Sequence, residues 1–133
     1  MPFDLVINLD GSSNPIENYL LTDGEAGVAG EVYVQTSGRL TKCGATATPE
    51  FIGLRTQALE ASSVTPYPVQ RITETDVFKT TSTATVAASL LGAKVTLHTT
   101  GLQVTATTTS GVATIVSTDG AATTSNVNVM FRR

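Results

Sequence analysis

Residues 92–133 read GAKVTLHTTGLQVTATTTSGVATIVSTDGAATTSNVNVMFRR. Apolar and polar residues alternate in four runs of this stretch, and a turn of glycine or small polar residues follows each of the first three. Because successive side chains of a β-strand point to opposite faces, the apolar residues of a run share one face. The stretch therefore predicts a four-stranded antiparallel meander with one polar face. Its apolar positions are Val95, Leu97, Leu102, Val104, Ala113, Ile115, Val127, Val129 and Phe131.

The N-terminal half adds further strand signals. Residues 31–35 and 39–43 are β-like runs on either side of a Thr-Ser-Gly turn, which predicts a hairpin. Residues 51–54 predict a short apolar strand, and residues 69–79 alternate again. The chain thus carries strand signals over most of its length.

One segment has helical spacing. Val86, Leu90 and Leu91 fall on one helical face, and Gly92 occupies the position that commonly ends a helix. We expect at most one short helix, around residues 84–91. The fold class that follows is mainly β, a small antiparallel β-barrel.

The length favours one domain. With 133 residues the chain is long enough for a single core, and no linker divides it. We expect an N-terminal arm or edge strand at 1–14 and a single β domain at 15–133. Within that domain, a lobe at 15–80 contains the hairpin and the meander occupies 92–131.

Composition and charge exclude several classes of function. Charged residues make up 14% of the chain and the net charge is −3, whereas a nucleic-acid binder normally has a basic face. No apolar run approaches the ~18 residues that a membrane span needs, and no signal peptide is visible. We expect no nucleic-acid partner, no membrane partner and synthesis in a cytoplasm.

The residues that could carry chemistry do not form a set. His98 is the only histidine and Cys43 the only cysteine, and neither has partners at a spacing typical of catalysis or metal binding. The remaining candidates are scattered carboxylates, so we expect no catalytic site and no cofactor. These carboxylates are Glu50, Glu60, Glu74 and Asp76.

A partial calcium-loop pattern is present near the N-terminus. Asn8, Asp10, Gly11 and Glu17 match four positions of the pattern, but Val6 stands where its first carboxylate is required. We interpret this segment as a solvated loop and expect no metal.

Three segments, in this order, carry a family resemblance. They are AGEVYVQTSGRLTKCG at 29–44, PEFIGL at 49–54 with PVQRIT at 68–73, and LLGAKVTLHTTGLQVT at 90–105. The chain resembles the head decoration, or capsid cement, proteins of tailed bacteriophages over about residues 26–131. The matching motifs are β-hairpin patterns and not catalytic signatures.

The resemblance implies a structural protein of the virion. Such proteins form small β-barrels or β-tulip folds, bind the major capsid protein on the outside of the expanded head, and stabilise the lattice as trimers or dimers. For this chain it implies synthesis in the host bacterial cytoplasm, a place on the capsid exterior, and a homo-oligomer, with a trimer favoured over a dimer.

Two sets of residues are candidates for contacts in such an assembly. Phe3, Leu5, Val6 and Ile7 are more apolar than a free terminus usually is, so we expect capsid contact there; the alternative is the first strand of the barrel. The polar face of the meander is a candidate subunit interface, with a solvated sheet face as the alternative. Its residues are Thr96, His98, Gln103, Thr105, Asn126 and Asn128.

A second class of function stays open beside decoration. The same composition fits another virion or cell-surface β-module, such as a tail-tube or adhesin-like domain that binds protein or glycan. A small hydrolase is disfavoured because no nucleophile, base and orienting group occur together.

Overall fold

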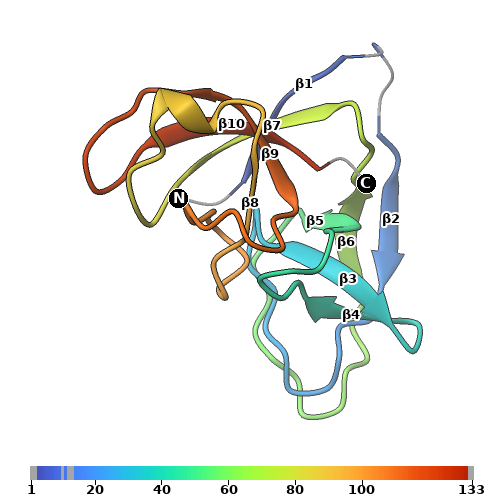
Figure 1. Ribbon diagram of the computed structural model, residues 1–133. Coiled ribbons are helices and arrows are strands. Elements are labelled where there is room, and N and C mark those ends of the chain that lie inside the picture. The colour runs from blue at the N-terminus through green and yellow to red at the C-terminus, as the bar shows by residue number, and fades with distance from the viewer. Residues whose placement is uncertain (1–2, 10, 12–13, 132–133) are drawn as a thin grey trace.

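The computed structural model describes residues 3–9, 11 and 14–131. Their strands form two five-stranded antiparallel sheets (Figure 1). The mainly β prediction is confirmed. The strand pairings of the described residues leave both sheets open, without the closure of a barrel.

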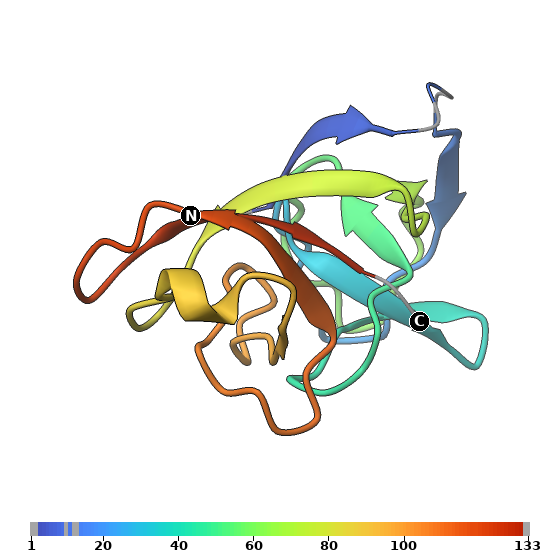
Figure 2. The same cartoon turned by 45° about the horizontal axis from the view of Figure 1, so that its top comes forward.

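Sheet A has the strand order β1-β7-β10-β9-β8. The long strand β7, yellow-green in Figure 2, lies between β1 and β10, so residues from the two ends of the chain meet in one sheet. Its strands are β1 (Asp4–Asn8), β7 (Asp76–Thr81), β10 (Asn126–Met130), β9 (Ala113–Thr118) and β8 (Lys94–Val95).

Sheet B has the strand order β2-β6-β5-β3-β4. The predicted hairpin is confirmed as β3 and β4, joined by a tight turn in which Ser37 and Gly38 have φ values of 51° and 79°. Positive φ at both central residues matches the twist of the two strands. The strands of sheet B are β2 (Ile16–Tyr19), β6 (Tyr67–Arg71), β5 (Phe51–Gly53), β3 (Val32–Thr36) and β4 (Arg39–Lys42).

The C-terminal meander is only partly as expected. Strands β8, β9 and β10 are neighbours, but residues 102–105 form no strand and pair through single bridges of Val104 with Leu97 and Ser82. Backbone bonds between Val104 and residues 81 and 83 hold this segment. The sheet takes its remaining strands, β7 and β1, from parts of the chain that precede the meander.

The helix expected around residues 84–91 is also shorter than predicted. Within the segment at 84–91, only Ala88–Leu90 is helical, as a 3-10 turn. The Val86 N–H donates to Ser125 Oγ, and the Val86 carbonyl accepts from Thr118 Oγ1. Because these tertiary bonds use the backbone groups that a helix would need, the segment before Ala88 stays extended.

The main core lies between the sheets. It joins Val32 and Ile52 of sheet B to Phe78 and Val129 of sheet A in one cluster of buried side chains. Sheet B also buries its other face, where Tyr33, Leu40, Phe51, Tyr67, Val69 and Leu21 form a second cluster. The loops at 20–30 and 54–66 extend together from that side, bonded to each other by Gly24 N–H to Glu60 O and by Gly27 with Gln57 (Figure 1).

One carboxylate is buried next to this core. Glu31 is 1% exposed, its Oε2 lies 3.6 Å from Lys42 Nζ, and its Oε1 has no hydrogen-bond partner. Burial raises the pKa of the Glu31 carboxyl above its ordinary range, while the Tyr33 hydroxyl and the Lys42 ammonium oppose that rise. An ionised Glu31 therefore opposes folding.

We predict that Phe3→Ala destabilises the protein by about 3–5 kcal/mol, the usual cost of emptying a buried phenylalanine site. Phe3 is 1% exposed and packs against Phe131 with a ring-centroid distance of 5.6 Å. Urea denaturation measures the change. The matched variant Leu9→Ala alters a side chain that is 58% exposed and is expected to stay within about 0.5 kcal/mol of wild type. Equal effects of the two substitutions would contradict the placement of Phe3.

We also predict that Glu31→Gln weakens the loss of stability that occurs as pH rises. A raised carboxyl pKa gives stability that is complete below the unfolded-state pKa and lost as pH rises through the folded-state pKa. Urea midpoints from about pH 4 to about pH 8 should converge at low pH, with the Gln variant more stable at high pH.

Glu60→Gln provides a control of opposite sign for that experiment. Hydrogen bonds from Thr65 and Val64 lower the pKa of the Glu60 carboxyl, so its contribution is present at neutral pH and lost on acidification. The assignment of Glu31 fails if its Gln variant shows the pH slope of wild type.

Candidate partner-binding surface

Strand β1 forms one edge of sheet A and carries exposed aliphatic side chains. Among the described strands its only sheet neighbour is β7, and Leu5, Val6, Ile7 and Leu9 are between 41% and 58% exposed. A run of aliphatic residues on a sheet edge is unusual, because natural edges are normally short, charged or covered. This edge, residues 5–9, is the candidate partner-binding surface and is called the β1 edge below.

Phe3 lies outside this surface. Its side chain is buried against Phe131, and its N–H donates to the Gly30 carbonyl at 3.0 Å. The prediction that Phe3 contacts a capsid is therefore wrong for its side chain, which belongs to the core. Leu5, Val6 and Ile7, predicted beside it, do lie at the surface.

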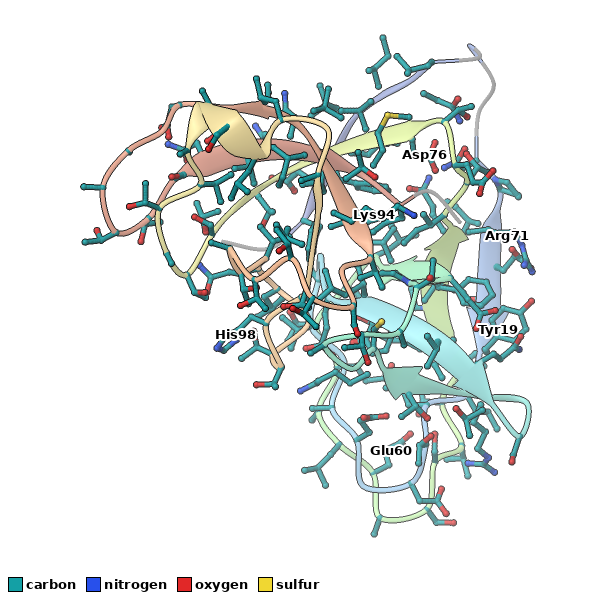
Figure 3. The ribbon with its side chains drawn as sticks, in the orientation of Figure 1. Tyr19, Glu60, Arg71, Asp76, Lys94 and His98 are labelled. Atoms are coloured by element: carbon teal, nitrogen blue, oxygen red, sulfur yellow. The ribbon has the colours of Figure 1, made fainter. Side chains whose placement is uncertain are left out.

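A polar network holds the C-terminal end of β1. Asp76 is fully buried, and its Oδ2 accepts from Asn14 Nδ2 at 2.6 Å and from the Thr73 N–H at 2.9 Å. Asn8 donates to Asn14 and accepts from the Thr75 hydroxyl. Figure 3 shows Asp76 at the turn that precedes β7. The β1 edge is thus anchored at one end by Phe3 and at the other by this network.

The other sheet edges differ from β1. Strand β8 has two residues, and β4 carries the basic residues Arg39 and Lys42. On β2, Glu17 makes a two-point contact with Arg71, at 3.0 Å for each bond, and accepts from the Tyr19 hydroxyl. Arg71 and Tyr19 lie close together in Figure 3. Among the described edge strands, β1 therefore has the longest run of exposed aliphatic residues.

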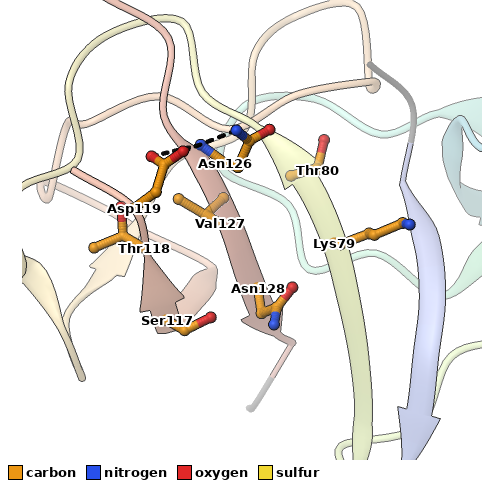
Figure 4. Close-up of a pocket in the computed structure, with 8 residues that line it drawn as sticks. All are labelled: Lys79, Thr80, Ser117, Thr118, Asp119, Asn126, Val127 and Asn128. Atoms are coloured by element: carbon orange, nitrogen blue, oxygen red, sulfur yellow. Dashed lines mark hydrogen bonds between the residues drawn. The ribbon is translucent and has the colours of Figure 1, made fainter. Parts of the chain in front are cut away.

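The six polar residues predicted as a subunit interface fall in two places. Asn126 and Asn128 line a shallow hollow of about 490 Å³ on the outer face of sheet A, together with Lys79, Ser117 and Asp119 (Figure 4). Ser117, Asn128 and Lys79 are direct cross-strand neighbours. The three residues form a row because the register of the strands places them opposite one another. The alternation within a single strand does not reveal this.

Asn126 is engaged inside that hollow. Its Nδ2 donates to Asp119 Oδ2 at 2.8 Å, and its backbone N–H donates to Asp119 Oδ1 at 3.0 Å. The Ala121 N–H also donates to Asp119, and these bonds lower the pKa of its carboxyl. Asp119 therefore orders the turn between β9 and β10 as an ionised group.

The other four predicted interface residues lie around the 96–105 turn. Thr96 is buried and its hydroxyl bonds to that of Thr105 at 2.6 Å. Gln103 donates to Thr81, and His98 Nδ1 is 3.0 Å from the Thr100 hydroxyl. The prediction of an exposed polar position is wrong for Thr96, because the segment that follows it folds back over it.

The residues considered for chemistry are held in structural contacts. Cys43 is fully buried, its Sγ donates to the Ala47 carbonyl, and burial raises the pKa of its thiol to about 12. Glu60 accepts two backbone bonds and the Thr65 hydroxyl. Within the described ranges, histidine, cysteine and carboxylate side chains form no group of three suited to a metal.

The described residues include part of the partial calcium loop. Glu17, its last matching position, pairs with Arg71, and Asp10 lies outside the described residues.

The exposed aliphatic residues Leu54 and Ile16 were not predicted as surface. The strand signal at 51–54 is real, but only the path of the chain shows that Leu54 leaves the core where β5 ends.

No protein family, no curated protein and no solved structure matches this chain. In the part of the chain that the structure describes, no helix is long and apolar enough to cross a membrane.

Proposed function

We propose that this protein is a non-enzymatic capsid decoration protein. It binds the major capsid protein on the outer surface of a tailed-phage head through the β1 edge and stabilises the expanded lattice. The exposure of Leu5, Val6 and Ile7 on an edge strand carries the proposal. The identity of the partner rests on the sequence resemblance.

The chemistry of the edge supports protein binding. Its side chains are aliphatic, and an edge strand also offers backbone N–H and C=O groups to an extended segment of another protein. Burying the exposed half of one aliphatic side chain contributes about 1 kcal/mol. Three such residues give a weak contact for one copy.

Because the contact made by one copy is weak, it favours attachment as an oligomer. When copies are joined, the second and third contacts form at high effective concentration, and the combined attachment far exceeds that of one copy. Because attachment selects the expanded lattice, it stabilises that state by mass action. A trimer on the capsid exterior fits this requirement better than a dimer.

The hollow on sheet A provides a surface for that oligomer. Ser117, Asn128 and Lys79 form a polar row across three strands, and Thr-rich or Asn-rich faces cost less to desolvate than densely charged ones. We assign subunit contact to this row. The buried Thr96 is excluded from it.

We predict that Val6→Lys weakens binding to emptied, expanded heads at least tenfold, without unfolding the protein. A lysine on a sheet edge is tolerated by the fold but disfavours burial against a partner. Co-sedimentation of purified protein with the heads measures the affinity. Tenfold corresponds to about 1.4 kcal/mol.

Val64→Lys is the matched control. Val64 is 71% exposed and Val6 is 50% exposed, but Val64 lies on the 54–66 loop, outside the β1 edge and outside the row at Asn128. Its binding should equal that of wild type. Equal loss in both variants, or binding of wild type only to tails or cell envelopes, overturns the proposal.

A further inference from the structure

A second hollow opens beside the N-terminal half of β1. It has a volume of about 290 Å³ and lies where the edge of sheet A approaches strands β5 and β6 of sheet B. Leu5 and Leu54 are exposed on it at 41% and 38%, and the buried Ile52 also lines it. We call this hollow the anchor slot.

Three small residues line part of the anchor slot. Ala29, Gly30 and Gly53 contribute to its lining. At Gly53 a Cβ would point toward the cluster of Tyr33 and Tyr67 and lie 2.4 Å from the Tyr67 hydroxyl, so a glycine is required there for β5 to pack against that cluster. Asp4 is the one charged residue among those that line the slot, which disfavours an anionic occupant.

The backbone of β1 faces the slot at one residue. The Phe3 N–H points away from β7, to the Gly30 carbonyl. Backbone groups two residues apart in a strand point the same way, so the Leu5 N–H and C=O also point away from β7. A bulge between Leu5 and Ile7 interrupts the register after that. Regular β-sheet hydrogen bonding to an extended segment of another protein is therefore confined to Leu5.

We infer that the anchor slot receives one aliphatic side chain from an extended segment of the partner protein, whose backbone bonds to Leu5. The inference rests on the proposed function for the identity of the partner, the major capsid protein. It adds the chemistry of the contact, namely a single uncharged anchor residue flanked by extended backbone.

The lining and position of the slot favour this occupant. Pockets for small molecules usually converge several polar groups on the ligand, whereas Asp4 and Gln70 are the two polar residues among those that line this hollow. It is continuous with Val6 and Ile7 on the β1 edge through Leu5. Anchor residues in apolar pockets commonly carry most of the binding energy of an interface.

The test uses a synthetic peptide and the whole protein. The probe is a blocked Lys-Thr-Val-Thr-Leu-Thr-Val-Thr-Lys peptide, and a second peptide has aspartate in place of the central leucine. Amide NMR of the labelled protein measures binding. We expect the leucine peptide to shift the amides of Leu5, Gly30 and Leu54, and the aspartate peptide to bind at least tenfold more weakly.

Two pairs of protein variants isolate the slot. Leu54→Asp puts a charge on its rim, and Leu59→Asp makes the same change at a leucine that is 60% exposed elsewhere. Ala29→Leu fills the slot, and Ala58→Leu adds the same atoms on the exposed 54–66 loop. Leu54→Asp and Ala29→Leu should abolish peptide binding and lower the affinity for heads at least tenfold. Their partners in each pair should bind the peptide and the heads like wild type.

The outcomes separate this inference from the proposed function. If wild type binds heads and Leu54→Asp binds them equally well, the anchor slot is overturned while decoration stands. If heads are not bound but the leucine peptide occupies the slot, the partner is overturned and the chemistry of the slot is supported. If the two peptides bind alike or not at all, the inference fails.

Discussion

The ring of Phe131 packs against those of Phe3 and Phe78, each at a centroid distance of 5.6 Å, and the course of β1 depends on this contact. Aromatic pairs of this kind add about 0.5–1.5 kcal/mol to the burial of their surface. Burying Phe3 brings the residues that follow it alongside β7, at the edge of sheet A. The aliphatic residues of β1 are exposed at that edge.

The two sheets divide structural and binding roles. Sheet B buries side chains on both faces, in the main core and in the cluster around Tyr33 and Tyr67, and it tolerates the buried Glu31 beside Lys42. Sheet A buries one face and leaves the other polar, with the row at Asn128. The anchor slot lies where the sheets meet. Its walls therefore come from a rigid, doubly packed sheet, and its mouth is an open strand edge.

Much of the local structure could be predicted because its determinants are local. The hairpin of β3 and β4 follows from alternation and from a glycine in its turn, and the apolar sides of β9 and β10 follow from period-two patterning. The predicted surface residues Leu5, Val6 and Ile7 were identified from their apolar character near the terminus, although that pattern fits a core strand equally well. The extent of the helix and the strand expected at 102–105 were wrong. In both places hydrogen bonds to distant segments compete with the local preference.

The sequence by itself determined the mainly β class, the hairpin and the low charge of the surface, since these depend on side-chain type and spacing along the chain. Only the tertiary structure decided that Phe3 is core while its neighbours are surface, because one aromatic contact with the opposite end of the chain fixes the strand. Tertiary structure also assembled the anchor slot. Leu5, Ala29 and Leu54 are far apart in the sequence, and no local pattern encodes that the two sheets bring them together.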